Sequence, residues 1–155
     1  MRVLGFDPGY DRLGIAILEG SRSKQSIIFS ECFKTNPNDS FEYRLSSVGK
    51  HAKTIIKKYS PNCVAIETLF FSNNQKTAMR VAETRGVLIF VATSTSIPVI
   101  QYSPQEIKVA VSGSGRGSKT DVSHMLHRLL PLPDKVMYDD EYDAIAVALT
   151  CIVSQ

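Results

Sequence analysis

Two acidic residues stand where apolar segments of this sequence end. Asp7 follows the apolar segment VLGF and comes directly before a Pro-Gly pair, and Glu67 closes the almost wholly apolar segment CVAI. Short apolar segments of this kind are typical of strands that are buried on both faces of a sheet. In an open α/β sheet, ligands bind beyond the carboxyl ends of the strands. We therefore expect Asp7 and Glu67 to point towards a common binding site.

A second pair of acids lies near the start of the last helical segment, DDEYDAIAVALTCIV. Asp140 and Asp143 are three residues apart, which puts both on one face of a helix. Clustered carboxylates repel one another, and their pKa values rise unless a cation joins them. Hard oxygen ligands select Mg²⁺ or Mn²⁺ over zinc. Two such ions, roughly 3.5 to 4 Å apart, are the standard device for cleaving a phosphodiester.

Each acid also fits a purely structural role. An aspartate before Pro-Gly is typical of a turn, which suits Asp7. Glu67 fits an ordinary charge at the end of a strand. Asp140 and Asp143 fit the positive end of a helix dipole. The combination of all four favours a metal site over these separate roles.

The elements that must position the acids follow from hydrophobic periodicity. In order along the chain, we expect strands at 3–6, 13–18 and 26–33, a helix at 41–59, a strand at 63–67, a helix at about 74–91, a strand at 97–102, and helices from 104, at about 120–130 and from 139. Strands come first and then alternate with helices. This order predicts one α/β domain over residues 1–155, with a mixed five-stranded sheet flanked by helices.

The segment SPQEIKVAV carries a clear helix start. Ser103 fits the N-cap, Pro104 the first helical position and Glu106 the third residue of a capping box. The Gly-Ser stretch SGSGRGSK then joins this helix to the next. We expect a flexible basic loop there.

Composition excludes several classes of protein. The chain has 155 residues, of which 43% are apolar and 21% are charged. That balance is typical of one globular domain, and no segment approaches the roughly 18 to 20 apolar residues of a membrane span. The beginning lacks the long apolar region of a secretory signal. The three cysteines form no C-x-x-C pair, so we expect reduced thiols in the cytoplasm. The net charge of +3 permits a polyanionic partner.

A nucleotide-binding protein is the main alternative from another class. The segment GSGRGSKT comes close to the phosphate-binding loop G-x-x-x-x-G-K-[ST]. However, Ser118 replaces the glycine before Lys119, and the segment follows a predicted helix where that loop would follow a strand. A basic loop that faces a phosphate backbone explains the same residues. His124 and His127 are three residues apart but have no third nitrogen or sulfur ligand, so we expect them on the surface.

The chain resembles the RuvC family of crossover junction endodeoxyribonucleases, which have the ribonuclease H-like fold. The resemblance covers nearly the whole chain and rests on GFDPG followed by Gly14, AIETLFF, ETRGV, QYSPQEIKVAVSGSGRGSK and DDEYDAIAVAL, in the family's order and spacing. A noncatalytic nucleic-acid-binding module on the same fold is disfavoured by the intact acids. Ribonuclease H-like proteins that process ribosomal RNA share the opening motif, but ETRGV and DAIAVAL favour the junction resolvases.

The resemblance implies roles for individual residues. The family's four catalytic, metal-binding acids fall on Asp7, Glu67, Asp140 and Asp143. The DNA-binding positions fall on Phe70, which stacks on bases, and on Lys108 and Lys119, with Arg116 in the basic loop between them. A buried position for Phe70 is the alternative, because large aromatic side chains are usually part of a core.

The resemblance also implies an activity and partners. It implies a structure-selective endonuclease that resolves four-way (Holliday) DNA junctions by paired nicks, uses two Mg²⁺ ions for which Mn²⁺ substitutes, and leaves 5′-phosphate and 3′-hydroxyl ends. It implies a homodimer, a role in recombination and repair, and a branch-migration helicase complex as a partner. We expect the dimer interface on the helix at 74–91, because six apolar residues there exceed one core-facing stripe: Met79, Val81, Val87, Leu88, Phe90 and Val91.

Overall fold

The computed structural model describes residues 1–69, 75–116, 118–133 and 137–155. Its elements are β1 (Arg2–Asp7), β2 (Arg12–Ser21), β3 (Lys24–Lys34), α1 (Phe41–Tyr59), β4 (Cys63–Glu67), α2 (Gln75–Ser94), β5 (Val99–Tyr102), α3 (Pro104–Ser112), α4 (Lys119–Leu129) and α5 (Asp139–Val153). The predicted order of strands and helices is confirmed.

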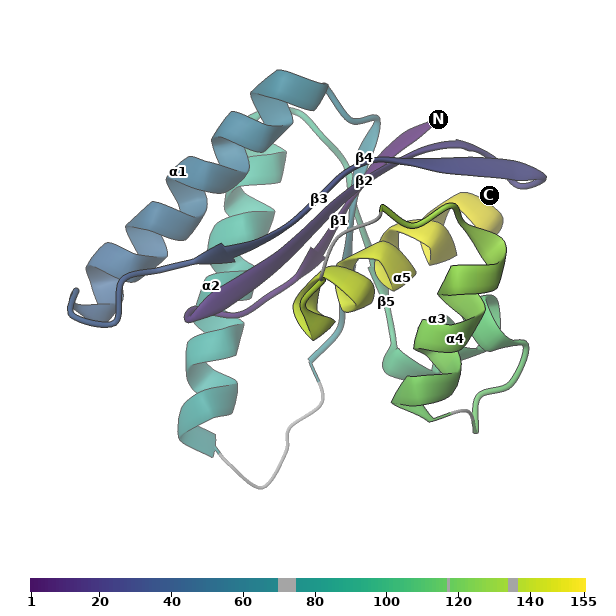
Figure 1. Cartoon of the computed structure of the whole chain (residues 1–155). Coiled ribbons are helices and arrows are strands. Elements are labelled where there is room, and N and C mark those ends of the chain that lie inside the picture. Colours follow the sequence, from purple (N-terminus) through teal and green to yellow (C-terminus); the bar gives the residue numbers. More distant parts are fainter. Residues whose placement is uncertain (70–74, 117, 134–136) are drawn as a thin grey trace.

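One mixed sheet forms the centre of the molecule, with strand order β3-β2-β1-β4-β5. β2 pairs in antiparallel orientation with both β1 and β3. On the other side of β1, β4 pairs parallel with β1, and β5 pairs parallel with β4. α1 and α2 lie on one side of the sheet, and α3, α4 and α5 lie on the other (Figure 1). The predicted mixed five-stranded sheet between helices is therefore confirmed.

Side-chain alternation divides the core into two layers. Leu4 and Phe6 of β1 pack with α1 and α2. Val3, from the same strand, packs with α5. Gly5 also faces α5, and a Cβ atom on it would lie 2.2 Å from the carbonyl oxygen of Ala144. The helix backbone therefore lies directly against the strand, which only glycine permits.

Capping boxes mark the starts of two helices, α3 and α4. Ser103 and Glu106 form the predicted capping box at the start of α3. A second capping box, between Ser118 and Asp121, starts α4 at Lys119. α4 therefore begins one residue earlier than expected, and this places Lys119 in the first turn of a helix.

The cysteines and the two histidines of the predicted helix at 120–130 differ in their burial. Cys63 and Cys151 are buried free thiols with their sulfur atoms 3.6 Å apart, and Cys32 is a half-buried free thiol. His124 and His127 are exposed, as expected. None of the helices in the described ranges combines the length and the apolar character needed to cross a membrane.

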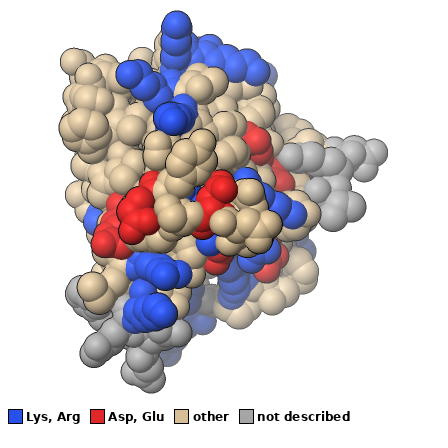
Figure 2. Space-filling view, turned by 90° about the vertical axis from the view of Figure 1, so that its left-hand side faces the viewer, with Lys and Arg blue, Asp and Glu red and all other residues tan. Residues whose placement is uncertain are grey.

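The face in Figure 2 separates charges of opposite sign. Acidic side chains gather near its middle, and basic side chains lie above and below them (Figure 2).

α1 ends at the top of the molecule in Figure 1, and its last turn carries Lys57 and Lys58. Both lysines are exposed and belong to the solvated face of that helix.

Candidate active site

β1 and β4 bring two of the predicted acids together. The strands are parallel neighbours with Phe6 paired to Ile66, so Asp7 and Glu67 follow at adjacent ends. Because side chains alternate along a strand, both acids fall on the face that packs against α5. The expectation that they share one edge of the sheet is confirmed.

α5 brings the other two acids to the same edge. Gly14 of β2 pairs with Asp7, and a Cβ atom on Gly14 would lie 1.9 Å from the carbonyl oxygen of Asp140. The first turn of α5 therefore lies against the sheet where Asp7 ends its strand. Asp143 lies one turn further along the helix and is half-buried. The predicted meeting of the four acids depends on this close contact.

The acids act on one another electrostatically. Burial raises the pKa of Asp7 from 3.8 to about 7, and the negative charges of Asp143 and Asp140 and then of Glu67 add to the effect. Burial, followed by the charge of Asp143, also raises the pKa of Glu67. The pKa of Asp143 is raised mainly by burial. A carboxylate cluster of this kind favours a bound cation, which relieves the repulsion.

Two cationic side chains contact the cluster. The Lys119 Nζ atom lies 2.6 Å from Asp143 Oδ2, and the Arg12 Nε atom lies 3.4 Å from Asp140 Oδ2. Burial opposes the charge on Lys119, but its hydrogen bond to Asp143 and the negative charges of Asp143, Asp7 and Asp139 together outweigh burial and raise the pKa of the lysine. Both cations reach the site from elements that flank α5.

A cleft of about 270 Å³ opens beside the acids. Glu67, Lys108, Lys119 and Asp143 are among the residues that line it. The positive charges of Lys108 and Lys119 oppose the rise in the pKa of Glu67. The cleft therefore combines carboxylates with two lysines, an arrangement that suits a phosphate group next to a metal site.

The donor set fits a hard divalent ion by its chemistry. Carboxylate oxygens are the ligands that Mg²⁺ and Mn²⁺ prefer. The pKa of Asp7 is raised first by burial and then by the neighbouring acids, and a bound cation would offset both effects. Within the described ranges, no three Asp, Glu, His or Cys side chains stand in a ready metal-binding arrangement. Lys119 and Arg12 instead each contact one carboxylate oxygen.

The other predicted site residues differ in their positions. Lys108 and Lys119 lie at the cleft with the acids. Arg116 is exposed and lines a separate hollow with Ser112 and Asp121, so the structure does not bring it to the acids. Phe70 lies outside the described residues, and its role as a stacking residue stays a prediction. Asp139 is exposed, and its charge raises the pKa values of Asp143 and Lys119.

Sequence reasoning did not assign a role to Arg85 or to Arg12. Arg85 Nε donates a hydrogen bond of 3.0 Å to the backbone oxygen of Glu67, and its guanidinium also contacts Gln101. It thereby holds the end of β4 against β5, which gives the ETRGV motif a structural reason. No local sequence signal marks Arg12, because its contact with Asp140 exists only once α5 has packed across β2.

Comparison with known proteins decides the family. The family model described as crossover junction endodeoxyribonuclease RuvC matches residues 3–151. This chain belongs to the RuvC family. Curated relatives of that name include those of Brachyspira hyodysenteriae, 40% identical over 149 residues, and Thermotoga maritima, 39% identical over 148 residues. These alignments cover 96% of this chain and 92% and 88% of the two relatives.

Solved structures agree with this membership. Thermus thermophilus RuvC in complex with a Holliday junction substrate matches with a TM-score of 0.92 and 28% identity, over 99% of this chain and 94% of that one. The yeast mitochondrial Holliday junction resolvase Ydc2, 17% identical with a TM-score of 0.70, shares the fold. The ribonuclease H-like fold and the RuvC-family junction endonuclease predicted from the sequence are therefore confirmed.

Proposed function

We propose that this RuvC-family chain resolves four-way DNA junctions by hydrolysing phosphodiesters at the edge of the sheet where its four acids meet. The observation that carries this proposal is geometric: Asp7 and Glu67 end neighbouring parallel strands, and the first turn of α5, which carries Asp140, lies against Gly14 opposite Asp7. Acids that serve only as turn or helix caps would not need to share one buried edge.

Asp7, Glu67, Asp140 and Asp143 would hold two divalent ions, which agrees with the divalent-metal dependence that family membership implies. When bound, such ions lower the pKa of water for attack and neutralise the charge that develops on the phosphate. Mg²⁺ is the expected ion, and Mn²⁺ is expected to substitute for it because it takes the same oxygen ligands. The expected products carry 5′-phosphate and 3′-hydroxyl ends.

The side chains of this protein would orient the reacting phosphate. Lys119 is 68% exposed although it contacts Asp143, so its ammonium group is free to turn towards a phosphate oxygen. Lys108 lines the same cleft and would contact a neighbouring phosphate as a point charge. Phe70 is proposed to stack on an unpaired base near the crossover, and Arg116 to contact the backbone further away.

A four-way junction is the proposed substrate, and a homodimer is the proposed working unit. The Thermus thermophilus relative, seen with a Holliday junction substrate, supports the choice of substrate. Met79 is 64% and Phe90 is 70% exposed on α2, which supports an interface on that helix. Leu88 and Val91 were also expected there, but they are buried in the chain's own core.

Two further expectations stay proposals. A branch-migration helicase complex is a proposed partner that follows from the family resemblance alone. A cytoplasmic location is proposed because the three cysteines are free thiols, as is usual in a reducing compartment. The nucleotide-binding alternative loses support, since the loop before Lys119 joins two helices and a phosphate-binding loop would follow a strand.

The direct test is cleavage of a synthetic four-way junction by purified protein with and without Mg²⁺. We expect cutting only with the metal. Asp7→Asn should abolish cutting yet bind the junction in Ca²⁺ with nearly unchanged affinity, because the acids hold metal while other residues hold DNA. Asp39→Asn removes a half-buried acid ahead of α1, outside the cluster of four acids, and serves as the matched control. Cutting by Asp7→Asn at the rate of the control would refute the assignment.

A further inference from the structure

A basic and aromatic cluster lies beside the acids on β2, β3 and the start of α5. Arg12, at the start of β2, pairs across the ladder with Lys34, at the end of β3. Lys34 Nζ donates a hydrogen bond of 2.7 Å to Tyr138 Oη and lies 4.1 Å from the centroid of that ring. Arg12 Nε lies 3.4 Å from Asp140 Oδ2. The three side chains thus adjoin the edge of the acid cluster.

Stability does not account for this cluster. The Arg12 side chain is 52% exposed, Lys34 is exposed, and Tyr138 is 43% exposed. Ion pairs and cation–π contacts at such exposed sites contribute on the order of 1 kcal/mol or less. Two cations beside an exposed aromatic ring are instead typical of a surface that binds nucleic acid.

The cluster also lies on the opposite side of the acids from Lys108 and Lys119, the two lysines predicted to bind DNA. In the strand order β3-β2-β1-β4-β5, Arg12 and Lys34 belong to the β3 end of the sheet. Lys108 and Lys119 line the cleft next to Glu67, at the end of β4. Asp7, on β1, lies between the two groups. A phosphate backbone that crosses the acids would meet cations on both sides of them.

We propose that Arg12 and Lys34, with Tyr138 as the residue that orients Lys34, form a second phosphate-binding rim. The inference rests on the proposed junction-cutting function and extends it. The rim would hold the DNA backbone on the β2–β3 side of the acids. The ligand is the phosphodiester backbone, because a guanidinium and an ammonium group next to each other suit phosphate oxygens. Its contacts add affinity without reading sequence.

Binding measurements separate the rim from the cutting reaction. We would measure the affinity of a fluorescent four-way junction for the Asp7→Asn protein in Ca²⁺, where no strand is cut, at several KCl concentrations. Each phosphate contact contributes about 0.9 to the slope of log affinity against log salt. We expect Lys34→Gln or Arg12→Gln to weaken binding several-fold and to flatten the slope by about 0.9, and the double variant by roughly twice that.

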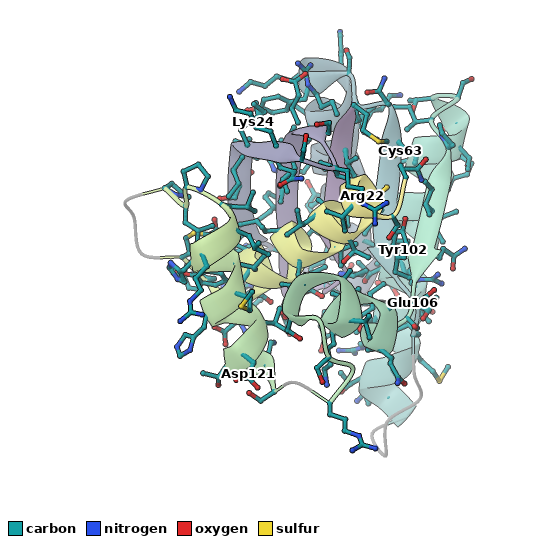
Figure 3. The ribbon with its side chains drawn as sticks, turned by 90° about the vertical axis from the view of Figure 1, so that its right-hand side faces the viewer. Arg22, Lys24, Cys63, Tyr102, Glu106 and Asp121 are labelled. Atoms are coloured by element: carbon teal, nitrogen blue, oxygen red, sulfur yellow. The ribbon has the colours of Figure 1, made fainter. Side chains whose placement is uncertain are left out.

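A lysine on the same hairpin provides a matched control. Lys24 pairs with Ser21 at the far end of the β2–β3 hairpin, where Arg22 and Lys24 are labelled in Figure 3. Lys24→Gln makes the same change in charge but should leave both affinity and slope unchanged. Lys34→Arg should keep the slope of the parent protein, because the positive charge is retained.

Two results would overturn the rim. If Lys34→Gln and Arg12→Gln match Lys24→Gln in slope, neither residue contacts phosphate. If Arg12→Gln slows cutting of the wild-type background in Mg²⁺ but leaves the slope unchanged, Arg12 acts only as the partner of Asp140. Both results are compatible with metal-dependent cutting by the wild-type protein, so failure of the rim is distinct from failure of the proposed function.

Discussion

The charged form of Asp7 lowers the stability of the folded protein, so the stability depends on pH. Its pKa lies near 7 because of burial and the neighbouring acids, against 3.8 for an unperturbed aspartate. The folded protein therefore holds this proton more tightly than the unfolded chain does. The associated stabilisation is complete below about pH 4 and is lost as the pH rises through 7. Above pH 7 the charged carboxylate is available to bind a cation.

Because charged Asp7 is destabilising, we expect that replacing this predicted catalytic residue raises the stability of the protein. At pH 8 without divalent metal, Asp7→Asn should melt at a higher temperature than the wild type. Its free energy of unfolding should be larger by on the order of 4 kcal/mol or less. At pH 4 the two proteins should melt alike, because Asp7 is then protonated. Thermal melting across this pH range provides the measurement.

Metal should reverse the order of stability. Adding Mg²⁺ at pH 8 should stabilise the wild type more than Asp7→Asn, because binding to the folded state alone raises its stability. The Mg²⁺ concentration at half effect should fall as the pH rises through 7, since protons compete for the carboxylate. Equal melting of the two metal-free proteins at every pH would show that charged Asp7 does not destabilise the folded protein.

At the scale of elements, α5 determines the position of the site. The helix lies against β1 and β2 only because Gly5 and Gly14 have no side chains, and its first turn carries Asp140. The sequence pattern therefore encodes the site in two places. The acids can be recognised in the sequence because their side chains suit a metal site. The two glycines stand out only as small residues within predicted strands.

Gly14→Ala tests this contact. The added methyl group would lie 1.9 Å from the Asp140 carbonyl oxygen, so the first turn of α5 must move. We expect junction cutting to fall at least a hundredfold, because a shift of about 1 Å in a catalytic group has an effect of that size. Measurements of cutting rate and thermal melting, at a temperature where the variant is folded, check the prediction.

Gly49→Ala is the matched control for that variant. It adds the same methyl group between α1 and α2, on the other side of the sheet, where its nearest neighbour is the Val87 Cγ1 atom at 2.9 Å. We expect a loss of stability but cutting near the wild-type rate. If both variants lose stability and retain cutting alike, the close contact of α5 with β2 is not needed for catalysis.

The structure also shows which features the sequence could predict. The strands that carry Asp7 and Glu67 were predictable because buried strands read as continuous apolar segments. The start of α3 was predictable because its capping box is local. The contacts of Arg12 with Asp140 and of Arg85 with Glu67 were not predictable, because they join elements that are distant in sequence and depend on how α5 and α2 pack.

At the scale of the whole molecule, one chain supplies one group of acids, whereas a four-way junction needs two cuts. Cutting a single strand leaves the duplexes joined, so resolution requires two sites at a fixed separation. An isologous dimer is the simplest assembly that provides them. α2 offers a surface for it, since Met79, Ala82, Gly86 and Phe90 recur at helical spacing on its exposed side.

Phe90→Asp tests the proposed dimer. Phe90 is 70% exposed, so the substitution should leave the fold intact while placing a charge in the interface. We expect sedimentation at micromolar concentration to change from dimer to monomer. Mapping both nicks on a junction should show that paired symmetric cuts give way to independent single cuts. Leu129→Asp, which changes another exposed apolar residue, 46% exposed on α4, should remain a dimer with paired cuts. A wild-type protein that sediments as a monomer while making paired cuts would contradict the need for two linked sites.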